Sequence, residues 1–452
     1  MSRDWPVSPL PRREFLRRMG LGTASAVGAA YGLSVWGPAE PSAATTRHGS
    51  NVASARGKTL VIVELGGGND GLNTVVPLND NRYHDLRPTL GVTEPILLDT
   101  KLSGDEVGLH PSLPKLAARF DRGNVAIVEG LGYDDADLSH FGSFAIWWSA
   151  LGGAGGGAGG AGWLGAYLDG TVGFDDPLAA IGIGPGPSPA LRGRESFATT
   201  IANDNGLQPR LPSWLQVSSF EAGESLAQEW SDFTPSQVDE STLLGQVQRA
   251  IGLTVKARTN LAKVLSSAAE SDTTRPTTAG VQAQRARYQD ASVAYSLVLA
   301  AELVQSSAKP RIVYVNGVGD FDTHEGQSAR HPALLQQLDD GIQAFFDALP
   351  AAQHDDVVLM TVSEFGRRPA ENGSGTDHGT ANVHLIVGGD GDGGVRGGRY
   401  GEPPSLTSLD RAGNLVHSAD FRRLYATGLQ WLGVDQTSPI LGDDFEAFPV
   451  FH

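Results

Sequence analysis

The chain has 452 residues, of which 40% are hydrophobic and none is cysteine. This composition excludes a mostly disordered chain, disulfide scaffolds, thiolate-bound zinc, iron–sulfur clusters and cysteine nucleophiles. The formal net charge is −17, and a strongly acidic surface repels phosphate backbones, so we expect no nucleic-acid partner.

The first 44 residues are typical of an export signal. Pro11-Arg12-Arg13-Glu14-Phe15-Leu16-Arg17 resembles the bacterial twin-arginine motif, a weakly apolar stretch follows, and Ser42-Ala43-Ala44 offers a cleavage site. We therefore predict a cleaved signal peptide over residues 1–44, with the twin-arginine translocase as a partner during export. The protein is then periplasmic or extracellular and contacts the membrane only transiently, while an uncleaved membrane anchor is the alternative.

Apolar, β-branched runs recur along the rest of the chain and alternate with helical patterns. The predicted strands are Leu60–Leu65, Val125–Glu129, Leu178–Ile183, Arg311–Val315, Val357–Val362 and Val383–Val387. The predicted helices are Pro111–Phe120, Leu138–Leu151, His331–Leu349 and Ser418–Leu432. This alternation predicts a three-layer α/β/α sandwich with a largely parallel central sheet, in which Leu60–Leu65, Arg311–Val315 and Val357–Val362 are neighbours.

Residues 185–310 contain few strand signals. They include two long stretches rich in Gln, Ala and Leu, at 243–269 and 281–306. We interpret 185–310 as a helical insertion or cap within one α/β domain that spans residues 45–452.

Acidic residues and histidines follow several of the predicted strands. Asp70 follows the first strand, Asp320, Asp322 and His324 follow the fourth, and Glu364 follows the fifth. Ligands of open α/β sheets collect at the carboxyl ends of strands, so these segments could converge. Carboxylates and imidazoles together suit zinc, manganese or iron. Each cluster alone could instead be a turn or a salt bridge, but together they favour a metal site.

Seven short motifs give the chain a resemblance to a known family. They are Gly67-Gly68-Asn69-Asp70-Gly71-Leu72-Asn73-Thr74, Leu109-His110-Pro111, Ser139-His140-Phe141, Gly162-Trp163-Leu164-Gly165, Phe321-Asp322-Thr323-His324, Ser363-Glu364-Phe365-Gly366-Arg367 and Thr376-Asp377-His378-Gly379. In this order, behind a twin-arginine leader, they resemble the bacterial family called domain of unknown function 1501, part of the alkaline phosphatase-like superfamily.

The resemblance implies an alkaline phosphatase-like fold and a site for one or two divalent ions, zinc or manganese. The superfamily uses an Asp after the first strand, a Ser or Thr nucleophile, and later Asp and His ligands. Carried over to this chain, the metal ligands are Asp70, Asp322, His324, Glu364, Asp377 and His378. Asp320 is an alternative to Asp322. A final His ligand could be His384 or His417, although His384 lies in an apolar run typical of a core histidine.

The resemblance also implies hydrolysis of a small phosphoester or related anionic ester. Ser139 is the best candidate nucleophile, although it could equally cap a helix, and His140 adjoins it. Arg367 would stabilise the equatorial oxygens of the substrate together with the metal. The alternative is a non-catalytic cell-envelope scaffold or binding protein on the same fold. Metal-free hydrolysis by Ser139 and His140 is a weaker option, because adjacent helix residues point in different directions.

Overall fold

A computed structural model describes most of the chain after residue 56. The described residues are 33–35, 57–99, 101, 106–151, 160–172, 176–194, 196, 198–201, 245, 248, 249, 252, 256, 257, 260, 261, 293–317, 319–390 and 394–452. The predicted twin-arginine motif, most of the predicted signal peptide and most of the 243–306 region lie outside these ranges.

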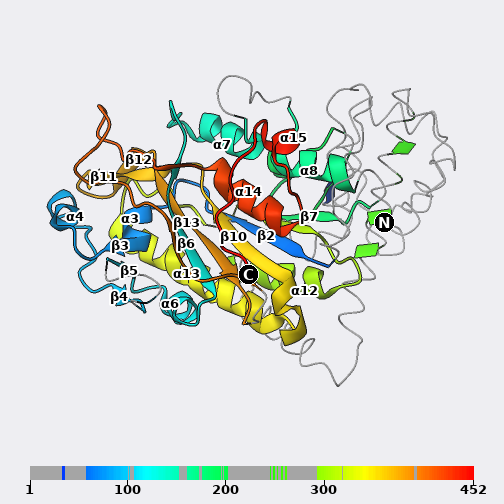
Figure 1. The fold of residues 1–452 in the computed structure, drawn as a ribbon, viewed down its shortest axis with the longest axis horizontal. Coiled ribbons are helices and arrows are strands. Elements are labelled where there is room, and N and C mark those ends of the chain that lie inside the picture. Colours follow the sequence, from blue (N-terminus) through cyan, green and yellow to red (C-terminus); the bar gives the residue numbers. More distant parts are fainter. Residues whose placement is uncertain are drawn as a thin grey trace, which may run out of the picture.

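The described residues form one large central sheet of ten strands (Figure 1). Its order is β1 (Leu33–Val35), β8 (Thr199–Ile201), β7 (Ala180–Ile183), β9 (Ile312–Val315), β2 (Thr59–Glu64), β10 (Val357–Val362), β13 (Asn382–Gly388), β6 (Val125–Gly132) and β14 (Gly398–Gly401), with β15 (Ala419–Asp420) also paired to β6. The strands from β8 to β10 are parallel, whereas β13 runs antiparallel to both of its neighbours. The sheet is therefore largely parallel, as predicted.

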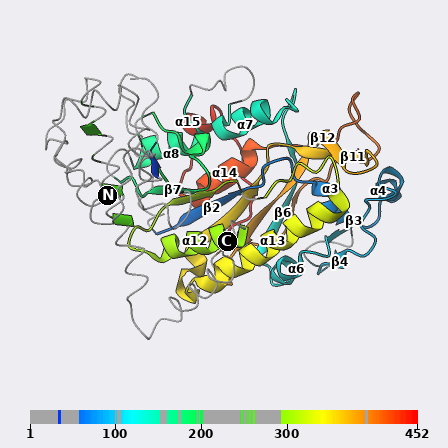
Figure 2. The same ribbon diagram turned by 180° about the vertical axis from the view of Figure 1, so that it is seen from behind.

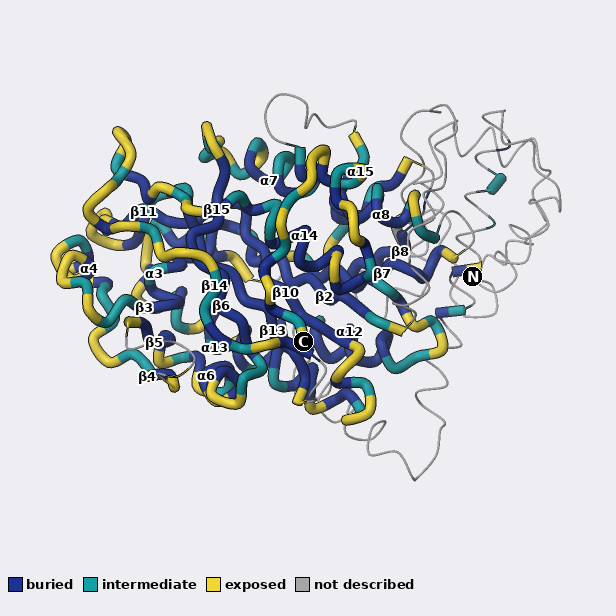
Figure 3. The backbone as a smooth tube through the Cα atoms, viewed as in Figure 1, coloured by how far each residue is buried: buried dark blue, intermediate teal, exposed yellow. Residues whose placement is uncertain are grey.

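Helices cover both faces of the sheet, which Figures 1 and 2 show from opposite sides. One face carries α6 (Pro114–Asp121), α12 (Val293–Gln305) and α13 (Gln327–Ala348), and the other carries α7 (His140–Ser149), α8 (Trp163–Thr171) and α14 (Arg422–Trp431). Along β2, Val61 and Val63 enter the first core while Leu60 and Ile62 enter the second. Figure 3 shows the central strands as buried. Because these strands are covered on both faces, their sequences are continuous apolar runs. The three-layer α/β/α sandwich is confirmed.

The neighbouring strands β9, β2 and β10 confirm the predicted adjacency of the three runs that precede the acidic clusters. The segment predicted to be a helical insertion contributes to the sandwich at both ends, because β8 extends the sheet and α12 packs in the helical layer beside α13. The helix predicted over Ser418–Leu432 begins at Arg422 instead, because Ala419 and Asp420 pair with β6 as β15.

Smaller elements lie around the end of the sheet at which β2 ends. They are α3 (Gly71–Thr74), β3 (Val75–Pro77), α4 (Asn81–Leu86), β4 (Ile96–Leu97), β5 (Val107–Leu109) and the antiparallel hairpin of β11 (Gly366–Glu371) and β12 (Thr376–Gly379). The 3₁₀ helices Pro189–Leu191 and Ala351–Asp356 and the helix α15 (Ser438–Leu441) complete the description. Within the described ranges, no helix combines the length and the apolar character needed to cross a bilayer.

Candidate metal centre

The candidate site lies where the loops after β9, β2 and β10 meet. Because these strands are parallel, their carboxyl ends share one edge of the sheet. Gly67 and Gly68 follow β2 with φ angles of +110° and +81°, and a Cβ added to Gly67 would lie 2.3 Å from the amide nitrogen of Asp322. Glycine is therefore required, because only a residue without a side chain allows this backbone contact. The contact places the β2 loop directly against the loop that carries Asp322.

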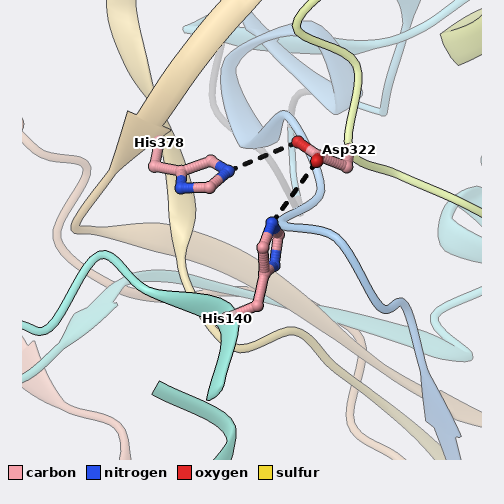
Figure 4. Close-up of side chains that lie close together, drawn as sticks. All are labelled: His140, Asp322 and His378. Carbon is pink, nitrogen blue, oxygen red and sulfur yellow. Dashed lines mark hydrogen bonds and ion pairs between the residues drawn. The ribbon is translucent and has the colours of Figure 1, made fainter. Parts of the chain in front are cut away.

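Two further elements bring histidines to this edge. His140 is the first residue of α7, and His378 lies in β12, opposite Arg367 of β11. His378 Nε2 is 3.3 Å from one carboxylate oxygen of Asp322, and His140 Nε2 is 3.4 Å from the other (Figure 4). The ligand atoms of these three residues all lie within 4.8 Å of one another, as the atoms around one metal ion would.

His324 adds a fourth potential ligand to this group. Its Nε2 lies 3.2 Å from Asp322 Oδ1 and 2.9 Å from His378 Nε2. Atoms at zinc-ligand distance from one tetrahedral ion are separated by about 3.3 Å. Asp322, His140, His324 and His378 are called the metal cluster below.

The Nδ1 atom of each histidine in the metal cluster is hydrogen-bonded to an acceptor. His140 Nδ1 donates to Glu364 Oε1 at 2.7 Å, and His378 Nδ1 donates to the carbonyl oxygen of Leu138 at 2.7 Å. His324 Nδ1 donates to Asp377 Oδ1 at 3.1 Å. Ionised carboxylates and carbonyls only accept, so each neutral histidine carries its proton on Nδ1. Each Nε2 lone pair is therefore free for a cation, the arrangement that orients metal-binding histidines.

The pKa values of Asp322 and His378 also favour the protonation states that metal ligands need. Burial alone would raise the pKa of Asp322, but the hydrogen bond and charge of Arg367 lower it to about 2. Burial lowers the pKa of His378, which keeps its imidazole neutral. The hydrogen bond to Glu364 raises the pKa of His140. At neutral pH the cluster thus offers a carboxylate and at least one neutral imidazole.

The Arg367 side chain is buried, and its hydrogen-bond partners are groups of the protein. Its guanidinium donates to the carbonyl oxygens of Gly67, Gly68, Phe321 and Thr376 and to Asp322 Oδ1. The role suggested by sequence, binding of substrate oxygens, does not match this arrangement because the guanidinium is engaged by the loops. Arg367 instead joins the β2 loop, the Asp322 loop and β12.

Asp70 lies outside the metal cluster. It is the N-cap of α3, and its Oδ2 accepts from Arg87 at 2.6 Å and from Gln327. Despite the cost of burial, the charge of Arg87 lowers the pKa of Asp70. The carboxylate predicted to bind metal is therefore neutralised within the protein by an arginine.

The remaining predicted residues are also placed. Ser139 is the exposed N-cap of α7 but makes no capping hydrogen bond with its side chain. Asp320 pairs with Arg330 at 2.8 Å. His384 is buried in β13, where burial lowers its pKa to about 3, and His417 lies 3.7 Å from Asp134. His384 thus occupies the core position that its apolar surroundings indicated.

The roles of some residues could not be assigned from sequence. Glu364 and Asp377, predicted as ligands, lie behind His140 and His324, and His140 itself points into the cluster. Spacing along the chain does not distinguish a ligand from its hydrogen-bond acceptor. Arg87 carries no sequence signal for its pairing with Asp70. Gln327 could have been recognised as a candidate site residue, because it and His331 are four residues apart and so lie on one face of a helix.

The comparisons with known proteins agree with the motif analysis. The sequence profile of the family described as "Protein of unknown function (DUF1501)" matches residues 124–446. The chain belongs to this family. No curated protein matches it.

Solved structures show low similarity to this DUF1501 protein. A protein of the alkaline phosphatase superfamily from Vibrio parahaemolyticus is 10% identical, with 95% of this chain and 78% of that chain covered and a TM-score of 0.33. The structure named Ps i-CgsB is 11% identical, with coverage of 86% and 74% and a TM-score of 0.33. A mutant TAB5 alkaline phosphatase with bound Mg is 9% identical, with coverage of 76% and 94% and a TM-score of 0.32.

Proposed function

We propose that this DUF1501 protein is an exported, divalent-metal-dependent hydrolase of a phosphoester or related anionic ester. The observation that carries the proposal is the orientation of three histidines whose Nδ1 atoms are held by acceptors while their Nε2 atoms surround Asp322. The ester class and the export come from the motifs of the sequence.

The metal cluster fits one zinc or manganese ion. It offers three imidazole nitrogens and a carboxylate, a donor set common to these ions. It is also accessible, because the side chains of His140, Asp322 and His324 are 31%, 33% and 40% exposed. A closed structural site would bury its ligands, so this exposure favours an ion that substrate or water can reach.

The residues of the chain would then have separate roles. When bound, a divalent ion in such a site lowers the pKa of a coordinated water and polarises an ester oxygen. His140, His324, His378 and Asp322 would hold the ion, and Glu364 and Asp377 would keep two of the histidines in the binding tautomer. Ser139 stays the candidate nucleophile, beside His140 at the exposed start of α7.

Metal analysis combined with hydrolysis of p-nitrophenyl phosphate and bis-p-nitrophenyl phosphate tests the proposal. We expect about one zinc or manganese ion per purified chain, as the metal cluster offers, and ester hydrolysis that chelator abolishes. His378→Ala should lose both the metal and the activity, whereas the core variant His384→Ala should keep its metal. A chain that binds neither ion would favour the scaffold function instead.

Export has its own test. Replacing Arg12 and Arg13 with Lys should trap the precursor in the cytoplasm, because the translocase reads the arginine pair. Cell fractionation of the double variant measures this. Unchanged export would contradict the twin-arginine assignment but would leave the metal site unaffected.

A further inference from the structure

Two stacked aromatic rings follow His140 on helix α7. Phe144 and Trp148 come four and eight residues after His140, so the three side chains share one side of the helix. The ring centroids of Phe144 and Trp148 are 4.7 Å apart, and their planes differ by 17°. Both residues are partly exposed. They are called the aromatic platform below, and the proposed function assigns them no role.

Contacts with the end of β2 place the platform next to the metal cluster. Trp148 Nε1 donates to Glu64 Oε2 at 2.7 Å. A Cβ built on Gly66 would lie 3.5 Å from Cζ of Phe144, so the tip of this ring lies over Gly66. The backbone amide that follows Gly66 donates to the carboxylate that accepts from His140 Nδ1. One short segment, residues 64–67, therefore positions both the platform and the metal ligand His140.

One face of the Phe144 ring is not stacked on another ring. Trp148 lies one helical turn farther along α7, so it covers the face of Phe144 that is directed away from His140. Among the described residues, no other aromatic ring contacts Phe144. The opposite face is directed toward the turn of His140, which lies about 6 Å nearer the start of the helix. This separation suits a ligand whose anionic group binds the metal and carries a ring attached directly to it.

The platform offers apolar surface and no free polar group. After His140, α7 contains no ionisable side chain, and the indole N–H of Trp148 is engaged by Glu64. Phe141, which is 90% exposed, adds another aromatic side chain at the start of the helix. A planar aromatic group can extend the stack of Phe144 and Trp148 and remove their apolar surface from water. The surface therefore favours an aromatic group over a charged one.

We propose that the aromatic platform binds the aryl group of the substrate, so that the hydrolase prefers phosphoesters of aromatic alcohols. This inference rests on the proposed function, because the anionic group of such an ester would bind the ion held by the metal cluster. Phe144 is then a specificity-determining residue one turn from the metal ligand His140. A membrane surface also suits exposed aromatic rings, but the position of Phe144 between His140 and Gly66 favours the ester.

Binding of phosphonates, whose carbon–phosphorus bond is not hydrolysed, tests the inference apart from catalysis. Phenylphosphonate and methylphosphonate are titrated by calorimetry into the zinc-loaded full chain. We expect phenylphosphonate to bind about tenfold more tightly, the effect of one aromatic stack. Phe144→Leu stays apolar, at a position outside the described hydrophobic cores, and should reduce this preference to less than about threefold. Phe144→Tyr keeps the ring and should retain the preference.

Phe451→Leu is the matched control. Phe451 is also partly exposed, and its ring contacts Trp431 with centroids 5.0 Å apart. Trp431 donates to the carbonyl oxygen of Thr59, which lies at the opposite end of β2 from the metal cluster. The same substitution beside a tryptophan should therefore leave the preference for phenylphosphonate unchanged.

Three results would overturn this inference alone. One is equal affinity of zinc-loaded wild type for the two phosphonates, and another is a preference that Phe144→Leu leaves unchanged. The third is binding to phosphatidylcholine vesicles that Phe144→Leu weakens while the phosphonate preference stays, which would assign the platform to a membrane surface. A chain that binds no zinc would instead remove the proposed function and this inference with it. Zinc and phosphonate binding without ester hydrolysis would contradict only the proposed catalysis.

Discussion

At the residue scale, the metal cluster depends on which ring nitrogen of each histidine is hydrogen-bonded to an acceptor. Four residues predicted from sequence as ligands or catalytic groups meet there, while Glu364 and Asp377 accept hydrogen bonds from behind. Such outer partners fix the tautomer and raise ligand basicity. The cluster therefore depends on carboxylates that need not touch the ion.

Asp377→Asn tests this dependence. Removing the charge that faces His324 Nδ1 should weaken zinc binding by about 10–100-fold, the usual effect of losing such a partner. Competition with a chromophoric chelator measures the affinity. Asp320→Asn is the matched control, because Asp320 is exposed in the neighbouring loop but pairs with Arg330. Equal losses in both variants would contradict a specific role for Asp377.

Glu64, the last residue of β2, provides a pH-dependent test of burial at this end of the central sheet. Burial raises the pKa of this carboxyl from 4.5 to about 7, although Trp148 and Tyr314 donate to it. The folded state therefore keeps a proton that the unfolded chain loses, and stability falls as pH rises from about 4.5 to about 7. By pH 8 this ionisation costs up to about 3 kcal/mol.

We expect Glu64→Gln to be more stable than the wild type at pH 8 and nearly equal to it at pH 4.5. The amide stays neutral and can still accept from Tyr314 and Trp148. Denaturant unfolding of chelator-treated protein at both pH values measures the difference. A difference that does not change with pH would show that Glu64 keeps an ordinary pKa.

At the element scale, short segments outside the sheet hold the site together. Arg87, just after α4, donates to the carbonyl oxygens of Arg368 and Pro369 in β11 and pairs with Asp70 at the start of α3. Gln327 of α13 accepts from Thr323, which lies between Asp322 and His324, and from Thr376, which lies two residues before His378. These contacts join helix ends to the hairpin that carries His378.

Arg87→Met should destabilise the fold by about 3–5 kcal/mol, because it leaves the Asp70 carboxylate buried without a cation. Adding Asp70→Asn should recover part of that loss. Urea unfolding of the single and double variants measures both. On the same segment, Arg82→Met removes only an exposed pair with Asp85 and should cost less than about 1 kcal/mol. No recovery in the double variant would contradict the buried-pair interpretation.

At the scale of the whole molecule, the proposed function predicts that metal binding and folding are coupled. The cluster draws on the Asp322 loop, α7 and β12, which converge only in the folded chain. An ion that binds the folded state alone stabilises it by about 2.7 kcal/mol when its concentration is 100 times Kd. A metal bound at the cluster would thus link segments that are far apart in sequence.

Thermal melting with chelator and with added zinc or manganese measures this coupling. We expect the metal to raise the Tm of the wild type and His324→Ala to reduce that gain. His384→Ala should change the Tm equally with and without metal, because His384 lies in the core away from the cluster. A wild-type Tm that ignores both chelator and metal would contradict the coupling.

The sequence by itself determined the layer architecture, the neighbouring strands β9, β2 and β10, and the family. Buried strands need continuous apolar runs, and the motif residues follow those runs directly, so both features can be recognised along the chain. Asp322, His324 and His378 could be chosen because they lie near strand ends, where parallel sheets bring loops together.

Only the tertiary structure decided which acidic groups face the metal cluster. Asp70 and Glu364 both follow core strands, yet Asp70 pairs with Arg87 and Gln327, while Glu364 accepts from His140. Gln327 is 257 residues from Asp70, and Glu364 is 224 residues from His140. Local patterns report the burial of each element, but the partner of a buried charge depends on how distant elements pack.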